Sequence, residues 1–101
     1  GTPVRTGKRF FSGEVIHVDR LGNLITNLTV SDFPEIRNRG FVLRAGLEIF
    51  DALMPSYAAA SVGEPVVVIG SCGTLEIAIN QGRADKHLGV ATGSPVELEL
   101  L

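Results

Sequence analysis

The chain has 101 residues, of which 45% are hydrophobic and 20% charged, a composition typical of one folded domain with a single modest core. Its net charge of -2 and its scattered basic residues argue against nucleic-acid binding, because a phosphate backbone requires a basic surface. One cysteine and two histidines exclude an intrachain disulfide and disfavour a structural metal site.

The chain shows no sign of a membrane segment or of a secretory leader. No apolar run approaches the roughly 20 residues that a spanning helix needs, and no signal peptide opens the sequence. We therefore expect a cytoplasmic protein without membrane partners. Twelve glycines and five prolines imply many turns, which favours an all-β domain over a helical bundle.

Residues 1–9 have no hydrophobic period and are interpreted as a linker or a disordered lead-in, so the folded domain is expected over residues 10–101. Residues 10–18 are rich in Phe, Val and Ile and predict a strand. A turn at Leu21-Gly22 and a second strand over residues 24–28 complete a hairpin.

Residues 29–39 break the β pattern and predict a short helical turn, with Ser31 as a possible cap and Pro34 tolerated in its first turn. Two short strands are then expected over residues 41–44 and 47–51. The stretch from residue 54 to 63 is the longest irregular segment.

The continuous Val/Ile run at residues 65–69 predicts a strand buried on both faces, and residues 74–79 alternate in polarity as a second strand does. Residues 83–88 predict a helical turn or two that ends at a C-terminal glycine cap. A last strand is expected over residues 95–101. About seven short strands with one or two helical turns indicate a small β-barrel or sandwich.

The first candidate site is the turn that contains Asp19, Gly22 and Asn23. The Asn23 amide offers both a donor and an acceptor, the complement of an adenine edge, and Asp19 suits an ammonium group or a ribose hydroxyl. The same composition is common in turns that only reverse the chain, so a structural turn is the alternative. Asn27, in the following strand, is expected to brace neighbouring loops.

The second candidate is the glycine-flanked loop that contains Ser71 and Cys72, whose bare backbone and small hydroxyl could approach a ligand closely. A plain hairpin turn is the alternative. Cys72 has no histidine near it in the sequence, so we do not expect it to act as a nucleophile.

The third candidate is the end of the strand at residues 74–79. Glu76 lies opposite the apolar face of that strand, where it is either solvated or at an interface. Asn80 follows the strand directly and is expected to cap backbone groups. No Ser, Cys or His arrangement follows the logic of a catalytic triad, and no phosphate-binding glycine loop is present.

Taken together, these segments resemble the C-terminal domain of the S-adenosyl-L-methionine (SAM) hydroxide adenosyltransferase family, relatives of the fluorinating and chlorinating enzymes that consume the same substrate. The resemblance runs from about residue 11 to residue 101. The matching segments, in order, are residues 13–20, 22–27, 63–65, 70–71, 73, 75–78, 80–82, 88–89 and 93–96.

The resemblance implies a small closed Greek-key β-barrel and a full-length homotrimer, with SAM held between the N-terminal domain of one subunit and the C-terminal domain of the next. By position, Asn23 would hydrogen-bond the adenine, Asp19 the methionine amino group, and Ser71 the methionine part. The backbone of Ile79, Asn80 and Gln81 would meet the adenine edge, and Glu76 is a further candidate for the pocket. No cofactor beyond the substrate and no metal are implied.

Two positions depart from the family pattern. Leu21 stands where the family usually has Phe before Gly-Asn, which weakens an aromatic contact there. Cys72 stands where the halogenating relatives carry Arg, which favours the members that use water. These members release adenosine and L-methionine.

The family's water-activating Asp, Arg and His belong to an N-terminal domain that the sequence does not contain. We therefore expect no catalytic residue in this chain and no turnover by the chain alone. The leading hypothesis is the substrate-binding C-terminal domain of a SAM hydrolase. The alternative is a free-standing module that binds an adenosyl ligand or assembles with itself.

Overall fold

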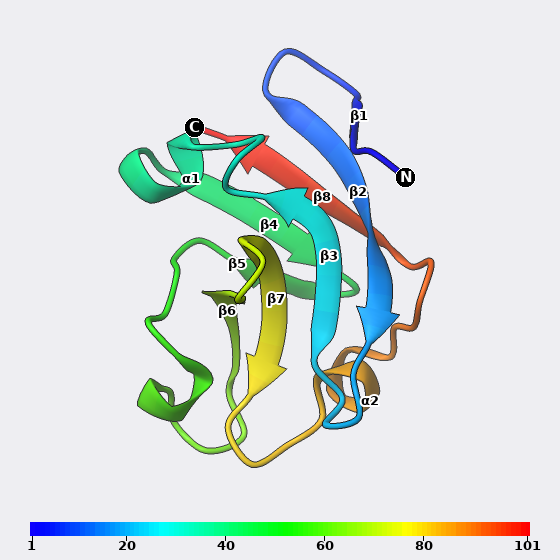
Figure 1. Ribbon diagram of the computed structural model, residues 1–101, viewed down its shortest axis with the longest axis vertical. Coiled ribbons are helices and arrows are strands. Elements are labelled where there is room, and N and C mark those ends of the chain that lie inside the picture. Colours follow the sequence, from blue (N-terminus) through cyan, green and yellow to red (C-terminus); the bar gives the residue numbers. More distant parts are fainter.

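The computed structural model describes all residues from 1 to 101 as a small, nearly closed antiparallel β-barrel (Figure 1). Its elements, in chain order, are β1 (Val4–Arg5), β2 (Phe10–Val18), β3 (Leu24–Thr29), α1 (Glu35–Asn38), β4 (Phe41–Ala45), β5 (Glu48–Phe50), the 3₁₀ turn η1 (Tyr57–Ala59), β6 (Pro65–Ile69), β7 (Thr74–Ile79), α2 (Ala84–Leu88) and β8 (Pro95–Leu100). No helix is long and apolar enough to cross a membrane.

The strands follow the order β5-β4-β8-β2-β3-β7-β6, so the β2–β3 hairpin lies between two strands that return over long connections. All pairings between these strands are antiparallel. The barrel closes where the chain leaves β5: Leu53 bridges Val67 of β6, and the Met54 N–H donates to the Val67 carbonyl at 2.9 Å. The Greek-key barrel predicted from the sequence is confirmed, although few backbone contacts join its two edge strands.

The interior is built from the apolar faces of these strands. The largest fully buried side chains include Leu24, Leu28, Leu43, Ile77 and Leu98. The one buried polar side chain, Thr26, donates its hydroxyl to the Leu75 carbonyl at 2.7 Å and accepts the Leu28 N–H at 3.2 Å. These bonds satisfy backbone groups where the pairing of β3 and β7 is irregular.

The elements lie close to their predicted bounds, with three differences. The lead-in contains β1, which pairs with β2 through Val4 and Ser12. The helical turn α1 starts after Pro34, without a side-chain cap, so Ser31 does not cap it. The irregular stretch over residues 54–63 contains η1.

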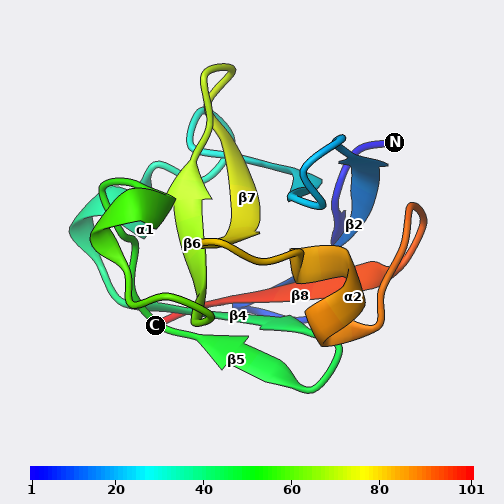
Figure 2. The same ribbon diagram turned by 90° about the horizontal axis from the view of Figure 1, so that it is seen from below.

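Three connections meet at one end of the barrel, the lower end in Figure 1: the β2–β3 turn, the segment from β7 to α2, and the η1 segment. In the view from below, α2 lies beside β8 and the η1 segment lies on the far side of β6 from it (Figure 2). α2 ends at Gly89, which adopts the left-handed conformation (φ 68°) that the sequence predicted for it. These connections carry the first and third candidate sites.

Candidate functional site

The turn between β2 and β3 is organised by the carboxylate of Asp19. Its Oδ1 accepts the backbone N–H groups of Leu21 and Asn23, both at 2.9 Å, and its Oδ2 accepts the Asn23 side-chain Nδ2 at 2.9 Å. Gly22 adopts φ +85°, which only glycine takes without strain. The turn therefore has one defined shape, and it sets the direction of the Asn23 amide.

The Asn23 amide keeps part of its hydrogen-bonding capacity for a ligand. One Nδ2 hydrogen is used on Asp19, which leaves the second hydrogen and the Oδ1 acceptor without partners in the protein. An ionised carboxylate can only accept, so the nitrogen and not the oxygen of Asn23 must face Asp19. The unused donor and acceptor together match the two-point edge of an adenine.

The turn is docked onto the start of α2. The Asp85 N–H donates to the Gly22 carbonyl at 3.0 Å, and Arg83 Nη1 donates to the Arg20 carbonyl at 2.9 Å. Arg83 also pairs with the Asp85 carboxylate at 3.1 Å, and this hydrogen bond is the main reason why the pKa of Asp85 lies below its ordinary value. Neither Arg83 nor Asp85 was singled out from the sequence.

The segment after β7 is tied to the η1 region through Asn80. Asn80 Nδ2 donates to the Ala60 carbonyl at 3.0 Å, and the Asn80 carbonyl accepts the Gly63 N–H at 3.0 Å. This bracing agrees with the capping role expected for Asn80. Gln81 follows with φ 59°, the one non-glycine residue in the left-handed region, so the backbone here is held in an unfavourable conformation.

The two segments meet in a hollow of about 420 Å³. Its lining residues are Leu21, Asn23, Tyr57, Ile79, Asn80, Gln81 and Gly82. Four residues predicted from the sequence, Asn23, Ile79, Asn80 and Gln81, are thus brought together from strands far apart in the chain. Polar amides on an otherwise apolar wall are the usual lining of a small-molecule site.

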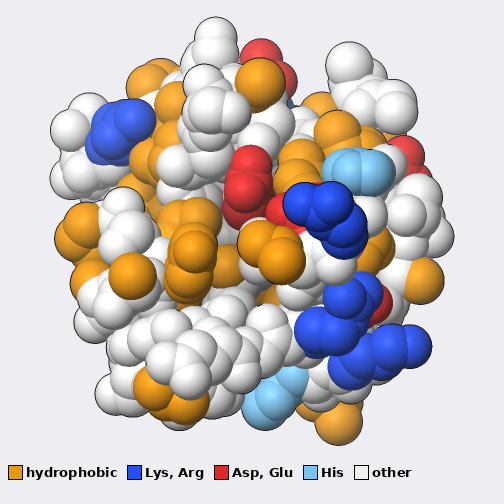
Figure 3. Space-filling model, turned by 60° about the horizontal axis from the view of Figure 1, so that its bottom comes forward, with side chains coloured by type: hydrophobic (Ala, Val, Ile, Leu, Met, Phe, Trp, Pro, Cys, Tyr) orange, Lys and Arg blue, Asp and Glu red, His pale blue; other side chains and the backbone are white.

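The rim of the hollow is apolar and exposed. The exposed fractions are 62% for Leu21 and 45% for Tyr57. Figure 3, in which the lower end of Figure 1 comes forward, shows hydrophobic side chains on one side of this end and basic side chains mostly on the other. The hollow is therefore open to a ligand or to a second protein surface.

Sequence reasoning did not find Tyr57. It lies in the stretch that carries no strand or helix period, so pattern analysis gave it no role. The available signal was its identity, because it is the one tyrosine of the chain. Tyr57 contributes the one aromatic side chain among the residues that line the hollow.

Ser71 and Glu76 do not line this hollow. Ser71 lies in the exposed turn before β7, whereas Asn80 follows the other end of that six-residue strand, roughly 20 Å away at about 3.3 Å per residue. Glu76 is half-buried and packs its carboxylate over Gly70, where it accepts the Thr74 hydroxyl at 3.3 Å. Their contacts with substrate remain predictions.

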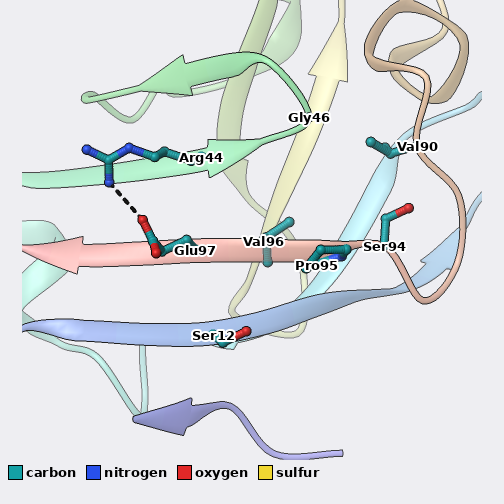
Figure 4. A pocket seen from close by; sticks show the side chains of 8 residues that line it. All are labelled: Ser12, Arg44, Gly46, Val90, Ser94, Pro95, Val96 and Glu97. Carbon is teal, nitrogen blue, oxygen red and sulfur yellow. Dashed lines mark hydrogen bonds and ion pairs between the residues drawn. The ribbon is translucent and has the colours of Figure 1, made fainter. Parts of the chain in front are cut away.

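A second hollow, of about 370 Å³, lies beside β4 and β8 (Figure 4). The charged side chains there already pair with one another: Arg44 Nη1 lies 3.1 Å from Glu97 Oε1 and 3.2 Å from Glu99 Oε1. None of the predicted site residues lines it. We therefore take the hollow at Asn23 as the candidate site.

Cys72 and His87 are reactive side chains outside the hollow. Cys72 is exposed and is not in a disulfide, and His87 Nε2 lies 3.3 Å from Glu48 Oε1. No group of three or more His, Cys, Asp or Glu side chains is placed to hold a metal ion. The polar side chains that line the hollow are two asparagines, one glutamine and one tyrosine.

Comparisons with known proteins point to one family. Residues 13–97 match the model of the SAM hydroxide adenosyltransferase C-terminal domain. Over 89 residues the chain is 37% identical to the (R)-S-adenosyl-L-methionine hydrolase of Thermus thermophilus, a match that covers 85% of this chain and 31% of that protein.

Two solved structures have the same fold. A crystal structure of an uncharacterized conserved protein from Thermotoga maritima superposes with a TM-score of 0.77 and 31% identity, over 97% of this chain and 38% of that one. A conserved hypothetical protein from Thermus thermophilus superposes with a TM-score of 0.68 and 35% identity, over 89% of this chain and 34% of that one. The chain spans about a third of the length of these relatives.

Proposed function

Since the chain belongs to the SAM hydroxide adenosyltransferase family, whose C-terminal domain it matches over residues 13–97, we propose that it supplies the adenine-binding wall of an enzyme that hydrolyses SAM to adenosine and L-methionine. The observation that carries this proposal is the hollow that joins Asn23 to the segment after β7. The named activity of the hydrolase relative supports the choice of substrate.

In this proposal the adenine lies in the hollow and is recognised at its edge and at its face. The Asn23 amide pairs with the base through its unused donor and acceptor. The Tyr57 ring stacks on the purine, and the backbone of Ile79 to Gln81 lines the remaining edge. The unfavourable backbone at Gln81 is consistent with a site whose shape is fixed before the ligand arrives.

The methionine part extends from the hollow along the β2–β3 turn. Asp19 accepts three hydrogen bonds from its own turn and keeps about one lone-pair site, which suits the methionine ammonium group. Ser71 lies at the other end of β7, so its proposed contact requires a ligand or a subunit that reaches there.

The reaction forms a bond between the oxygen of water and C5′ of the ribose. The C5′–S bond breaks, its electron pair stays on sulfur, and methionine leaves as a neutral thioether while water loses a proton. We assign this chain the positioning of the substrate, an important share of catalysis, and place water activation in the remaining two thirds of the full-length protein.

A homotrimer would complete the site, with this hollow facing the N-terminal domain of the neighbouring subunit. The exposed Leu21 and Tyr57 that line the hollow support such a contact, because apolar side chains gathered at one place favour association. In that arrangement the substrate is enclosed only after assembly.

The proposal is tested by titrating the full-length protein with adenosine in a calorimeter. Asn23→Ala should weaken binding roughly 10- to 100-fold, because it removes one two-point contact with the base. Asn38→Ala is the matched control, since Asn38 is exposed at the end of α1 and does not line the hollow. An unchanged dissociation constant for Asn23→Ala would contradict the assignment. Tight one-to-one binding by the present chain alone would favour a free-standing adenosyl-binding module.

A further inference from the structure

We propose that Asp19 acts as a positioning residue that makes the site specific for an exocyclic amino group, by fixing which end of the Asn23 amide faces the ligand. This inference rests on the proposed function, because it assumes that a purine occupies the hollow. It adds a specificity mechanism that works through a residue outside the lining of the hollow.

The first step is the fixed position of the two Asp19 oxygens. Oδ1 receives two backbone N–H groups, those of Leu21 and Asn23, each at 2.9 Å. These donors belong to a turn that is held independently by the Gly22 N–H to the Asp19 carbonyl and the Asp19 N–H to the Asn23 carbonyl, both at 3.0 Å. Oδ2 is thereby directed at the Asn23 side chain.

The second step is the consequence for Asn23. If the Asn23 side-chain oxygen faced Asp19 Oδ2, two acceptors would lie at hydrogen-bond distance from each other. The Asn23 amide must therefore face Asp19 with Nδ2. Its Oδ1 is then an acceptor with no partner in the protein, and it belongs to a residue that lines the hollow. Most asparagines can flip to suit a ligand, but this one cannot without losing the bond to Asp19.

The third step concerns the purine. An adenine presents the exocyclic N6 donor beside the N7 acceptor, which the fixed Oδ1 and the remaining Nδ2 hydrogen can pair with at once. A hypoxanthine presents O6 in place of N6, and this acceptor would face the Asn23 oxygen. The locked amide should therefore favour adenosine over inosine by roughly 10- to 100-fold, the range for one good two-point contact.

Asp19→Asn gives a sharp test, because the new side chain has nearly the same shape and only one sensible orientation. Its oxygen must take the position of Oδ1, where two backbone N–H groups require an acceptor. Its NH₂ group must then take the position of Oδ2 and face the Asn23 amide as a donor. Asn23 is expected to flip and present its own NH₂ to the ligand, the arrangement that suits O6.

The experiment measures the dissociation constants of adenosine and inosine for the full-length protein, its Asp19→Asn variant and an Asp32→Asn control. Asp32 is exposed and its side chain makes no hydrogen bond. Wild type and the control should both prefer adenosine, whereas Asp19→Asn should lower the adenosine-to-inosine preference at least tenfold or invert it. A weaker affinity for both ligands with the ratio unchanged would overturn the inference, because a purely structural role predicts that result.

A second measurement reads the amide without a ligand. In the ¹⁵N–¹H spectrum of the present chain, the Asn23 Nδ2 proton that is bonded to Asp19 should have a chemical shift well separated from that of the second Nδ2 proton. Asp19→Asn should change the chemical shift of the bonded proton. If the spectrum changes in this way but wild type binds neither nucleoside, the proposed function fails, while the fixed orientation of the Asn23 amide is confirmed. If wild type binds both equally, the specificity mechanism fails while the adenosyl site stands.

Discussion

At the scale of single residues, Gly22 meets a conformational and a packing requirement at the same time. Its φ of +85° lies in the left-handed region, and a Cβ there would come within 2.8 Å of both the Arg83 Cβ and the Asp85 Oδ1. Gly89 shares the conformation (φ +68°) but has open space where a Cβ would lie. The two glycines therefore separate the cost of the backbone conformation from the cost of a steric clash.

We predict that Gly89→Ala lowers the free energy of unfolding by about 1 kcal/mol, the cost of a left-handed alanine. Gly22→Ala should cost about 2 to 3 kcal/mol, because Arg83 and Asp85 must also move away from the turn. Urea unfolding of the two variants measures the difference. The same Gly22→Ala change should weaken adenosine binding, whereas Gly89→Ala should not. Equal losses of stability in the two variants would show that the turn does not pack against α2 as described.

At the scale of elements, α2 is a brace for the β2–β3 turn. Its five residues are too few to be stable alone, so its position depends on contacts such as those of Asp85 with Arg83 and with the Gly22 carbonyl. The Arg83 hydrogen bond holds the pKa of Asp85 below its ordinary value of 3.8. A lowered folded-state pKa contributes stability above the unfolded value, and that contribution is lost as the pH falls below it.

We therefore predict that Asp85→Asn destabilises the chain at neutral and mildly acidic pH by an amount that is constant there. The difference between the variant and wild type should shrink as the pH falls through 3.8 and below, because the unfolded chain protonates Asp85 there before the folded chain does. Chemical unfolding of both proteins across this range gives the comparison. Asp32→Asn is the control, since it makes the same chemical change at an exposed carboxylate whose side chain forms no hydrogen bond. A difference that grows as the pH falls would contradict this role of Asp85.

Strands were predictable here because their signals are local. The Val/Ile run of β6 and the alternation of β7 each contain enough information to fix their bounds, which the structure reproduces over residues 65–69 and 74–79. The grouping of the site was only partly predictable. The pattern places Ser71 and Asn80 at opposite ends of the predicted strand β7, but only the fold shows that Tyr57 comes to Asn80 through the loop bound at Ala60.

At the scale of the whole molecule, the barrel combines one continuous core with an open candidate site. Sixteen of its buried residues form one hydrophobic cluster within this chain, so we expect the fold to be stable by itself. Its candidate site is an open hollow with an exposed apolar rim, and the chain corresponds to about a third of its relatives. Stability and activity should therefore separate when the domain is studied apart from the rest of the protein.

We predict that this chain alone unfolds cooperatively but does not release adenosine from SAM, because our proposal assigns it the positioning of the substrate and not the activation of water. Adding the matching N-terminal domain should restore adenosine release, and chromatographic detection of adenosine measures it. The Asn23→Ala chain, mixed in the same way, should assemble equally well and restore less activity, since the hollow has lost its two-point contact with the base. Adenosine release by the chain alone would place water activation inside the barrel. If the two domains assemble but the complex still releases no adenosine, the proposed role of this domain in SAM hydrolysis would be contradicted.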